Sequence, residues 1–161
     1  MAIFDAKLEF SDEQDVGQVT GTYAATNTLC FSDTTLESSG LELGAGQPVY
    51  FNARVGTEAI AQVTGATSGA CTLTLAVVNE ADTTIDSSSE VMVQTRAFTE
   101  DELTAGAWLV RVALPVDIDK QPYMGVLYSI GGATSAAGTV NAWLDHGPQS
   151  SYDTQVASSN I

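Results

Sequence analysis

The sequence predicts an all-β fold in which about eight short antiparallel strands form one sandwich, jelly roll or barrel. Apolar and polar residues alternate with a period of two in most segments, as expected for strands that bury one face. Turns rich in Gly, Ser and Asp, such as residues 44–48, 86–89 and 131–132, separate these segments. A length of 161 residues and an apolar fraction of 44% suit one domain with its own core.

Six segments show the strand pattern most clearly: residues 48–55, 70–78, 90–95, 108–114, 123–130 and 139–144. Weaker candidates are residues 7–10 and 27–31. Strict alternation in the fourth segment predicts one shared face for Trp108, Val110, Val112 and Leu114.

Residues 99–104 are the helical exception to this pattern. Thr99 and Glu102 have the spacing of a capping box, in which each residue satisfies the backbone of the other. The sequence therefore predicts a single short helical turn that closes at Gly106.

The charge of the chain excludes two classes of partner. Twenty acidic residues and five cations give a formal net charge of −15, although charged residues make up only 16% of the chain. The cations are scattered singly: Lys7, Arg54, Arg96, Arg111 and Lys120. Nucleic acids and anionic membranes bind clustered Lys and Arg. We therefore expect no nucleic-acid partner and no membrane partner.

The sequence also predicts where the protein is made. No apolar run approaches the roughly 20 residues that a membrane-spanning helix needs. Residues 1–7 lack the basic start and apolar stretch of a secretory signal. We expect synthesis and initial residence in the cytoplasm.

Side chains that carry catalysis or bind metals are scarce. His146 is the only imidazole, no Gly-x-Ser-x-Gly elbow occurs, and no carboxylate pair stands out, so we expect no catalytic residue and no enzyme activity. Cys30 and Cys71 are expected to be free, buried thiols, because disulfides are rare in a reducing compartment. They are too few to form a zinc site, and no cofactor motif is present.

Two acidic runs, residues 12–15 and 117–119, place carboxylates in short loops, and carboxylate oxygens are ligands that calcium prefers. Neither run matches the 12-residue EF-hand loop. We therefore predict no metal-binding residue and expect solvated acidic side chains, with a structural cation left open.

Aromatic side chains support one alternative function, a carbohydrate-binding or adhesion module on a phage or cell surface. The candidates for stacking on a sugar are Tyr50, Phe51, Trp108, Tyr123, Tyr128 and Trp143. Most of them lie in strands among apolar neighbours, which favours packing in the core. The alternative requires exposed rings in a row.

Four segments occur in a familiar order: residues 8–14, 43–50, 103–106 leading into 108–115, and 121–126. Together they resemble the capsid cement, or decoration, proteins of tailed bacteriophages, a small jelly-roll family known from a Bordetella short-tailed phage. The resemblance runs from about residue 3 to residue 146. It implies an antiparallel β-sandwich of jelly-roll type.

The resemblance also implies a function. Members of the family are expected to form a homotrimer on the outer capsid surface of the virion, where each trimer clamps neighbouring subunits of the major capsid protein. The family offers no catalytic residue to carry over. A protein of this kind is made in the host cytoplasm.

Residues 1–146 are expected to form the single jelly-roll domain, with residues 1–7 as a possible N-terminal arm. Residues 147–161 form a polar tail that cannot bury enough surface to order itself. Apolar or unsupported residues in these ends are the candidates for contacts between subunits or with the capsid: Ile3, Phe4, Lys7, Tyr152 and Val156.

Overall fold

A computed structural model describes residues 8–30, 48–65, 71–115 and 121–145. The eight longer strands are β1 (Glu9–Asp15), β2 (Gly21–Ala24), β4 (Tyr50–Val55), β6 (Cys71–Glu80), β7 (Glu90–Gln94), β9 (Trp108–Ala113), β10 (Tyr123–Gly132) and β12 (Thr139–Asp145). Four shorter strands are β3 (Leu29–Cys30), β5 (Ala61–Gln62), β8 (Phe98–Thr99) and β11 (Ser135–Ala137). A 3₁₀ turn, η2 (Glu100–Glu102), follows β8 directly.

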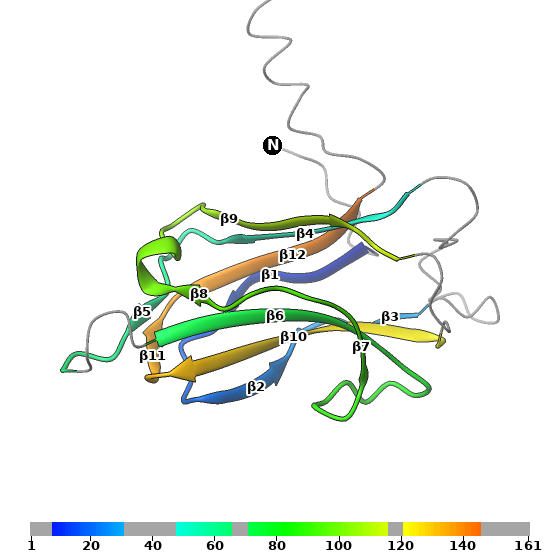
Figure 1. Cartoon of the computed structure of the whole chain (residues 1–161), viewed down its shortest axis with the longest axis horizontal. Helices are drawn as coiled ribbons and strands as arrows, with labels where there is room; N and C mark the ends of the chain where they lie inside the picture. The colour runs from blue at the N-terminus through cyan, green and yellow to red at the C-terminus, as the bar shows by residue number, and fades with distance from the viewer. Residues whose placement is uncertain (1–7, 31–47, 66–70, 116–120, 146–161) are drawn as a thin grey trace, which may run out of the picture.

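The longer strands form two antiparallel sheets that pack face to face (Figure 1). One sheet has the order β1-β12-β4-β9, and the path of the other is β2-β10-β6-β7. In the second sheet β3 also pairs with β10 and β8 with β6, which makes it six-stranded. Numbered along the chain, the eight longer strands have the orders 1-8-3-6 and 2-7-4-5. This is the jelly-roll arrangement, so the predicted fold class is confirmed.

Each sheet contributes alternate residues to one shared core. From the four-stranded sheet, Phe10 and Phe51 meet edge to face with ring centroids 6.2 Å apart. From the other sheet, the hydroxyl of the fully buried Tyr128 forms one hydrogen bond of 2.6 Å with the Ser11 hydroxyl, so each of the two buried groups has a partner. Burial raises the pKa of Tyr128 well above its usual value.

The six clear strand predictions all correspond to observed strands, and the two weak ones overlap β1 and β3. Within β6, every second residue from Cys71 to Leu75 is buried in the core, as expected for a strand that buries one face. The prediction missed β2, a four-residue strand that buries no side chain fully. The capping box is present and precedes η2 as expected.

The outer side of the six-stranded sheet carries a second, smaller apolar cluster: Ala76, Val78, Ile85 and Leu127. Ile85 belongs to the loop between β6 and β7, so the chain covers this sheet with its own loop. Gly125 makes room for the cover, because a Cβ atom there would lie 2.7 Å from Ile85 Cγ1.

Candidate interaction surface

The outward side of the four-stranded sheet is a grid of side chains set by strand pairing. Its three rows are Asn141, Arg54 and Trp108; then Glu9, Trp143, Asn52 and Arg111; then Asp145, Tyr50 and Ala113. The opposite side chains of β4, Phe51, Ala53 and Val55, point into the core. Two arginines and two tryptophans share this outward side: Arg54, Trp108, Arg111 and Trp143. We call these four side chains the Trp–Arg face.

The four side chains of the Trp–Arg face stack on one another. The ring centroids of Trp108 and Trp143 are 5.6 Å apart at an interplanar angle of 57°. Arg111 Cζ lies 4.1 Å from the Trp108 centroid, and Arg54 Cζ lies 5.9 Å from that of Trp143. These distances are typical of cation–π contacts. Trp143 is buried beneath this layer, whereas Trp108 keeps 47% of its surface exposed.

A β-bulge places Trp108 on this face and corrects the sequence prediction. Ala53 pairs with Val110, but Arg54 pairs with Trp108, so Leu109 is an extra residue in β9. Val110 and Val112 lie on the core side as predicted, while the bulge turns Trp108 outward. Leu109 is buried with only 8% exposed.

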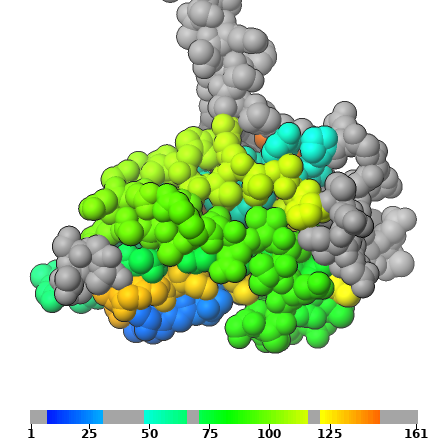
Figure 2. All heavy atoms as spheres, in the orientation of Figure 1, coloured from blue at the N-terminus to red at the C-terminus, as the bar shows by residue number. Residues whose placement is uncertain are grey.

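Charge is unevenly distributed over this outward side. The arginines belong to β4 and β9, and Glu9 and Asp145 belong to β1 and β12. Burial, aided by the nearby Asp12, raises the pKa of Glu9. The β9 edge is thus aromatic and cationic. Figure 2 shows residues of β9, coloured yellow-green, at the molecular surface.

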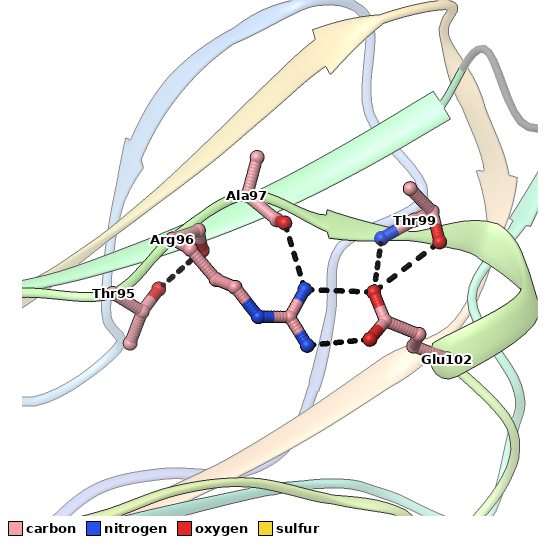
Figure 3. A network of polar contacts seen from close by, with 5 residues as sticks. All are labelled: Thr95, Arg96, Ala97, Thr99 and Glu102. Carbon is pink, nitrogen blue, oxygen red and sulfur yellow. Dashed lines mark hydrogen bonds and ion pairs between the residues drawn. The ribbon is translucent and has the colours of Figure 1, made fainter.

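Arg96, the third cation of the described ranges, contacts residues that are close to it in the sequence (Figure 3). Its guanidinium pairs with both carboxylate oxygens of Glu102, with Nη1 2.8 Å from Oε2, and lies 4.4 Å from the Phe98 ring. Glu102 also accepts a hydrogen bond of 3.0 Å from the Thr99 backbone N–H. The Arg96 pair, followed by the Thr99 backbone, lowers the pKa of Glu102 to about 2. Arg96 therefore holds η2 in place.

A polar cluster around Glu13 closes the β1 side of the same sheet. Glu13 adopts a left-handed backbone (φ 46°) at an irregularity in the pairing of β1 with β12. Its carboxylate accepts hydrogen bonds from the Thr139 hydroxyl (2.7 Å), the Thr57 backbone and hydroxyl (both 2.8 Å) and the Asn141 amide (2.8 Å). We call these residues the Glu13 clasp.

Two of the three acidic residues in the run at residues 12–15, Glu13 and Asp15, accept hydrogen bonds from the chain itself. Hydrogen bonds from Thr139, then Thr57 and Asn141, lower the pKa of Glu13 to about 2, so it is ionised at neutral pH. Asp15 accepts a hydrogen bond of 2.7 Å from the Gly17 N–H. These carboxylates bind the chain's own donors. Within the described ranges, no three His, Cys, Asp or Glu side chains gather as a metal site would require.

Several predicted residues lie outside the described part of the chain. They are the interface candidates Ile3, Phe4, Lys7, Tyr152 and Val156, together with His146 and the acidic run at 117–119. Of the thiols, Cys71 is free and buried as predicted, and burial raises its pKa. Cys30 is free but only half-buried, so the prediction of burial is wrong for it.

The aromatic side chains give the carbohydrate alternative little support. Phe51 and Tyr128 lie in the core, as predicted. Trp108 is the one exposed aromatic of the described residues, and its ring contacts Arg111 and Trp143. These residues do not present a row of exposed rings.

The chain matches a known protein family. A family model described as Bbp16 matches residues 10–144, from the first core strand to the last. The chain belongs to the Bbp16 family. Bbp16 is a family of Bordetella phage proteins, which confirms the resemblance drawn from the sequence. No curated protein matches the chain.

The match covers both sheets of the jelly roll, including every residue of the Trp–Arg face and the Glu13 clasp. In the described residues of this Bbp16 member, no helix has the length and apolarity to cross a membrane.

Proposed function

We propose that this Bbp16 member is a non-enzymatic capsid cement protein that binds the outer surface of a phage head and bridges subunits of the major capsid protein. The observation that carries the proposal is the jelly-roll strand order in a member of a phage protein family. A compact sandwich with two broad faces provides a rigid body for bridging neighbouring subunits.

Bridging explains how a small protein stabilises a shell. Packaged DNA presses outward, and the shell fails where neighbouring capsomers separate. A homotrimer at a three-fold position matches the symmetry of its site. Its three contacts are linked, so one that opens rebinds at high effective concentration, and avidity exceeds a single contact by about 10²- to 10⁴-fold. The net charge of −15 per subunit keeps unbound trimers soluble and apart from one another.

The test is reconstitution on phage heads that lack this protein. Purified full-length chain should bind these heads to saturation, and decorated heads should retain DNA to a higher temperature than bare heads. Binding should weaken as the salt concentration rises, because an acidic protein stays attached to a shell through contacts between charges, and salt screens these contacts. Absence of binding, or decoration that leaves DNA retention unchanged, would contradict the proposal.

The homotrimer is tested by mass in solution. The expected value is about 50 kDa, three times the 16.8 kDa chain. A monomer at working concentrations would contradict the trimer. The proposal assigns the N-terminal candidates Ile3, Phe4 and Lys7 and the tail candidates Tyr152 and Val156 to subunit or capsid contacts. Shells fully decorated by trimers lacking residues 147–161 would remove the tail from that assignment.

A further inference from the structure

The β9 half of the Trp–Arg face is an unusual surface for this chain. Trp108 is 47% exposed, the only aromatic among the large exposed apolar residues of the described ranges. The others are valines: Val19, Val63 and Val91. Two of the three arginines lie together on this face, although the chain carries only five cations and a net charge of −15.

We propose that the β9 half of the Trp–Arg face, centred on Trp108 and Arg111, is the docking surface for an acidic segment of the major capsid protein. The inference rests on the proposed cement function and names the face that performs it. The occupant is a peptide segment whose carboxylates pair with the guanidinium groups and whose aliphatic carbons pack on Trp108.

Charge complementarity selects an acidic occupant. Most of this chain repels carboxylates, so an acidic segment needs a local cationic surface. The Arg54 guanidinium has no ion pair within the described residues: it lies over the Trp143 ring, and its buried Nε has no hydrogen-bond partner there. Arg54 therefore contributes a positive charge to the face that no carboxylate of the described residues neutralises.

Stacking also prepares the face for binding. A guanidinium that stacks on an indole uses its flat side, and its N–H donors lie in the plane, directed sideways. Carboxylates bind such donors in pairs. Since Arg111 and Trp108 already contact each other, less side-chain entropy is lost when a partner binds. Trp and Arg are also the residues that most often dominate binding energy at interfaces.

A second copy of the chain is a poorer occupant. Packing this face against the same face of another copy would bring together two sets of guanidinium groups, and like charges repel. An acidic face of another copy would instead make the patch a contact within the oligomer. The test separates this outcome from docking on the shell.

The experiment measures binding of full-length variants to phage heads that lack the protein. Trp108→Ala and Arg111→Gln should each weaken binding at least tenfold. Two matched controls lie away from the face: Val91→Ala, which trims an exposed apolar residue of β7, and Ser87→Asp, which shifts the charge by −1 as Arg111→Gln does. Both controls should bind within twofold of the wild type. Arg111→Lys keeps the charge but loses the planar fork, and it should give an intermediate loss.

The outcomes separate the two proposals. If the wild type does not bind the heads, the cement function itself fails. If the wild type binds and the Trp108 and Arg111 variants bind equally well, cement function stands and this docking face is wrong. If the variant, free in solution, forms a smaller oligomer than the wild type, the face is a contact between subunits and the inference is wrong. If its melting temperature falls by more than about 5 °C, the chain itself covers the face, which also overturns the inference.

Discussion

The two sheets of this jelly roll close their outer sides in different ways. On the six-stranded sheet, the β6–β7 loop places Ile85 over an apolar patch that includes Val78 and Leu127. On the four-stranded sheet, the outward side chains are stacked arginines and tryptophans, and the Glu13 clasp secures the β1 side. One side is closed by hydrophobic burial and the other by polar and cation–π contacts.

This difference indicates which side is available to a partner. Burying apolar surface beneath the chain's own loop stabilises the fold and leaves little for another molecule to bind. The Trp–Arg face instead keeps Trp108 exposed beside a fixed charge. Substitutions in the Ile85 cover should therefore affect folding, whereas substitutions at Trp108 should affect binding. The Glu13 clasp should respond to pH, and the cover should not.

The largest effect is expected from Gly56→Ala, which breaks the Glu13 clasp. A Cβ atom at residue 56 would clash with the Thr139 hydroxyl and the Glu13 carboxylate, and the backbone there is fixed by a hydrogen bond of 2.7 Å from the Gly56 N–H to the Thr139 carbonyl. We expect a loss of about 3 kcal/mol in the free energy of unfolding, measured by urea titration.

The control for Gly56→Ala is Gly106→Ala. Nothing lies within 4 Å of a Cβ atom at residue 106, so the cost there is only the strain of its left-handed backbone (φ 75°), about 1 kcal/mol. Gly56 has no positive φ, so its loss should come from the crowded Cβ atom alone. A loss for Gly56→Ala no larger than that for Gly106→Ala would show that the clasp yields to the added methyl group.

Removing the apolar cover is the next largest change. Ile85→Ala should lower the free energy of unfolding by about 2 kcal/mol, because three methylene or methyl groups leave the patch on Val78 and Leu127. The loss should be the same at low and high salt, and binding to phage heads should be unchanged. Val91→Ala, on the 51% exposed Val91, should cost under about 0.5 kcal/mol. A loss that depends on salt would contradict hydrophobic closure.

Neutralising the clasp gives a smaller and pH-dependent loss. Glu13→Gln should cost about 1.5 kcal/mol at pH 7, because hydrogen bonds to a charged acceptor are lost. The folded-state pKa of Glu13 is lowered from 4.5 to about 2. Its contribution is therefore complete above about pH 4.5 and disappears as the pH falls through about 2.

Urea titrations of the wild type and Glu13→Gln at a series of pH values isolate this residue from the other acids. The difference in unfolding free energy between the two proteins should shrink steadily below pH 4.5. Glu58→Gln neutralises an exposed carboxylate on the loop after β4 and should change stability little. A difference for Glu13→Gln that persists undiminished at pH 2 would show that its charge is not responsible.

The sequence was most informative where structure depends on neighbouring residues. The long strands were predictable because each buries one face, which imposes alternation. The η2 turn was predictable because Thr99 and Glu102 are three residues apart and bond each other directly. The four-residue strand β2 was missed because it buries no side chain fully, so its pattern carries no hydrophobic signal.

The surface features were not predictable in this way. The Glu13 clasp joins positions 13, 57, 139 and 141, which only the folded sheet brings together. The bulge at Leu109 is a property of pairing between β4 and β9, so alternation within β9 assigned Trp108 to the wrong face. The five cations looked scattered along the chain, yet cross-strand pairing gathers Arg54 and Arg111 around the tryptophans.

The smallest effect on folding is expected from Trp108→Ala, and this variant sharpens the comparison between the two outer sides. Because Trp108 is 47% exposed, the free chain should lose about 1 kcal/mol or less, a shift of no more than about 4 °C in melting temperature. Trp108→Phe should retain part of the stacking with Arg111 and shift less. A melting temperature lowered as far as that of Ile85→Ala would show that both sheets are closed by burial, and the distinction between a folding side and a binding side would fail.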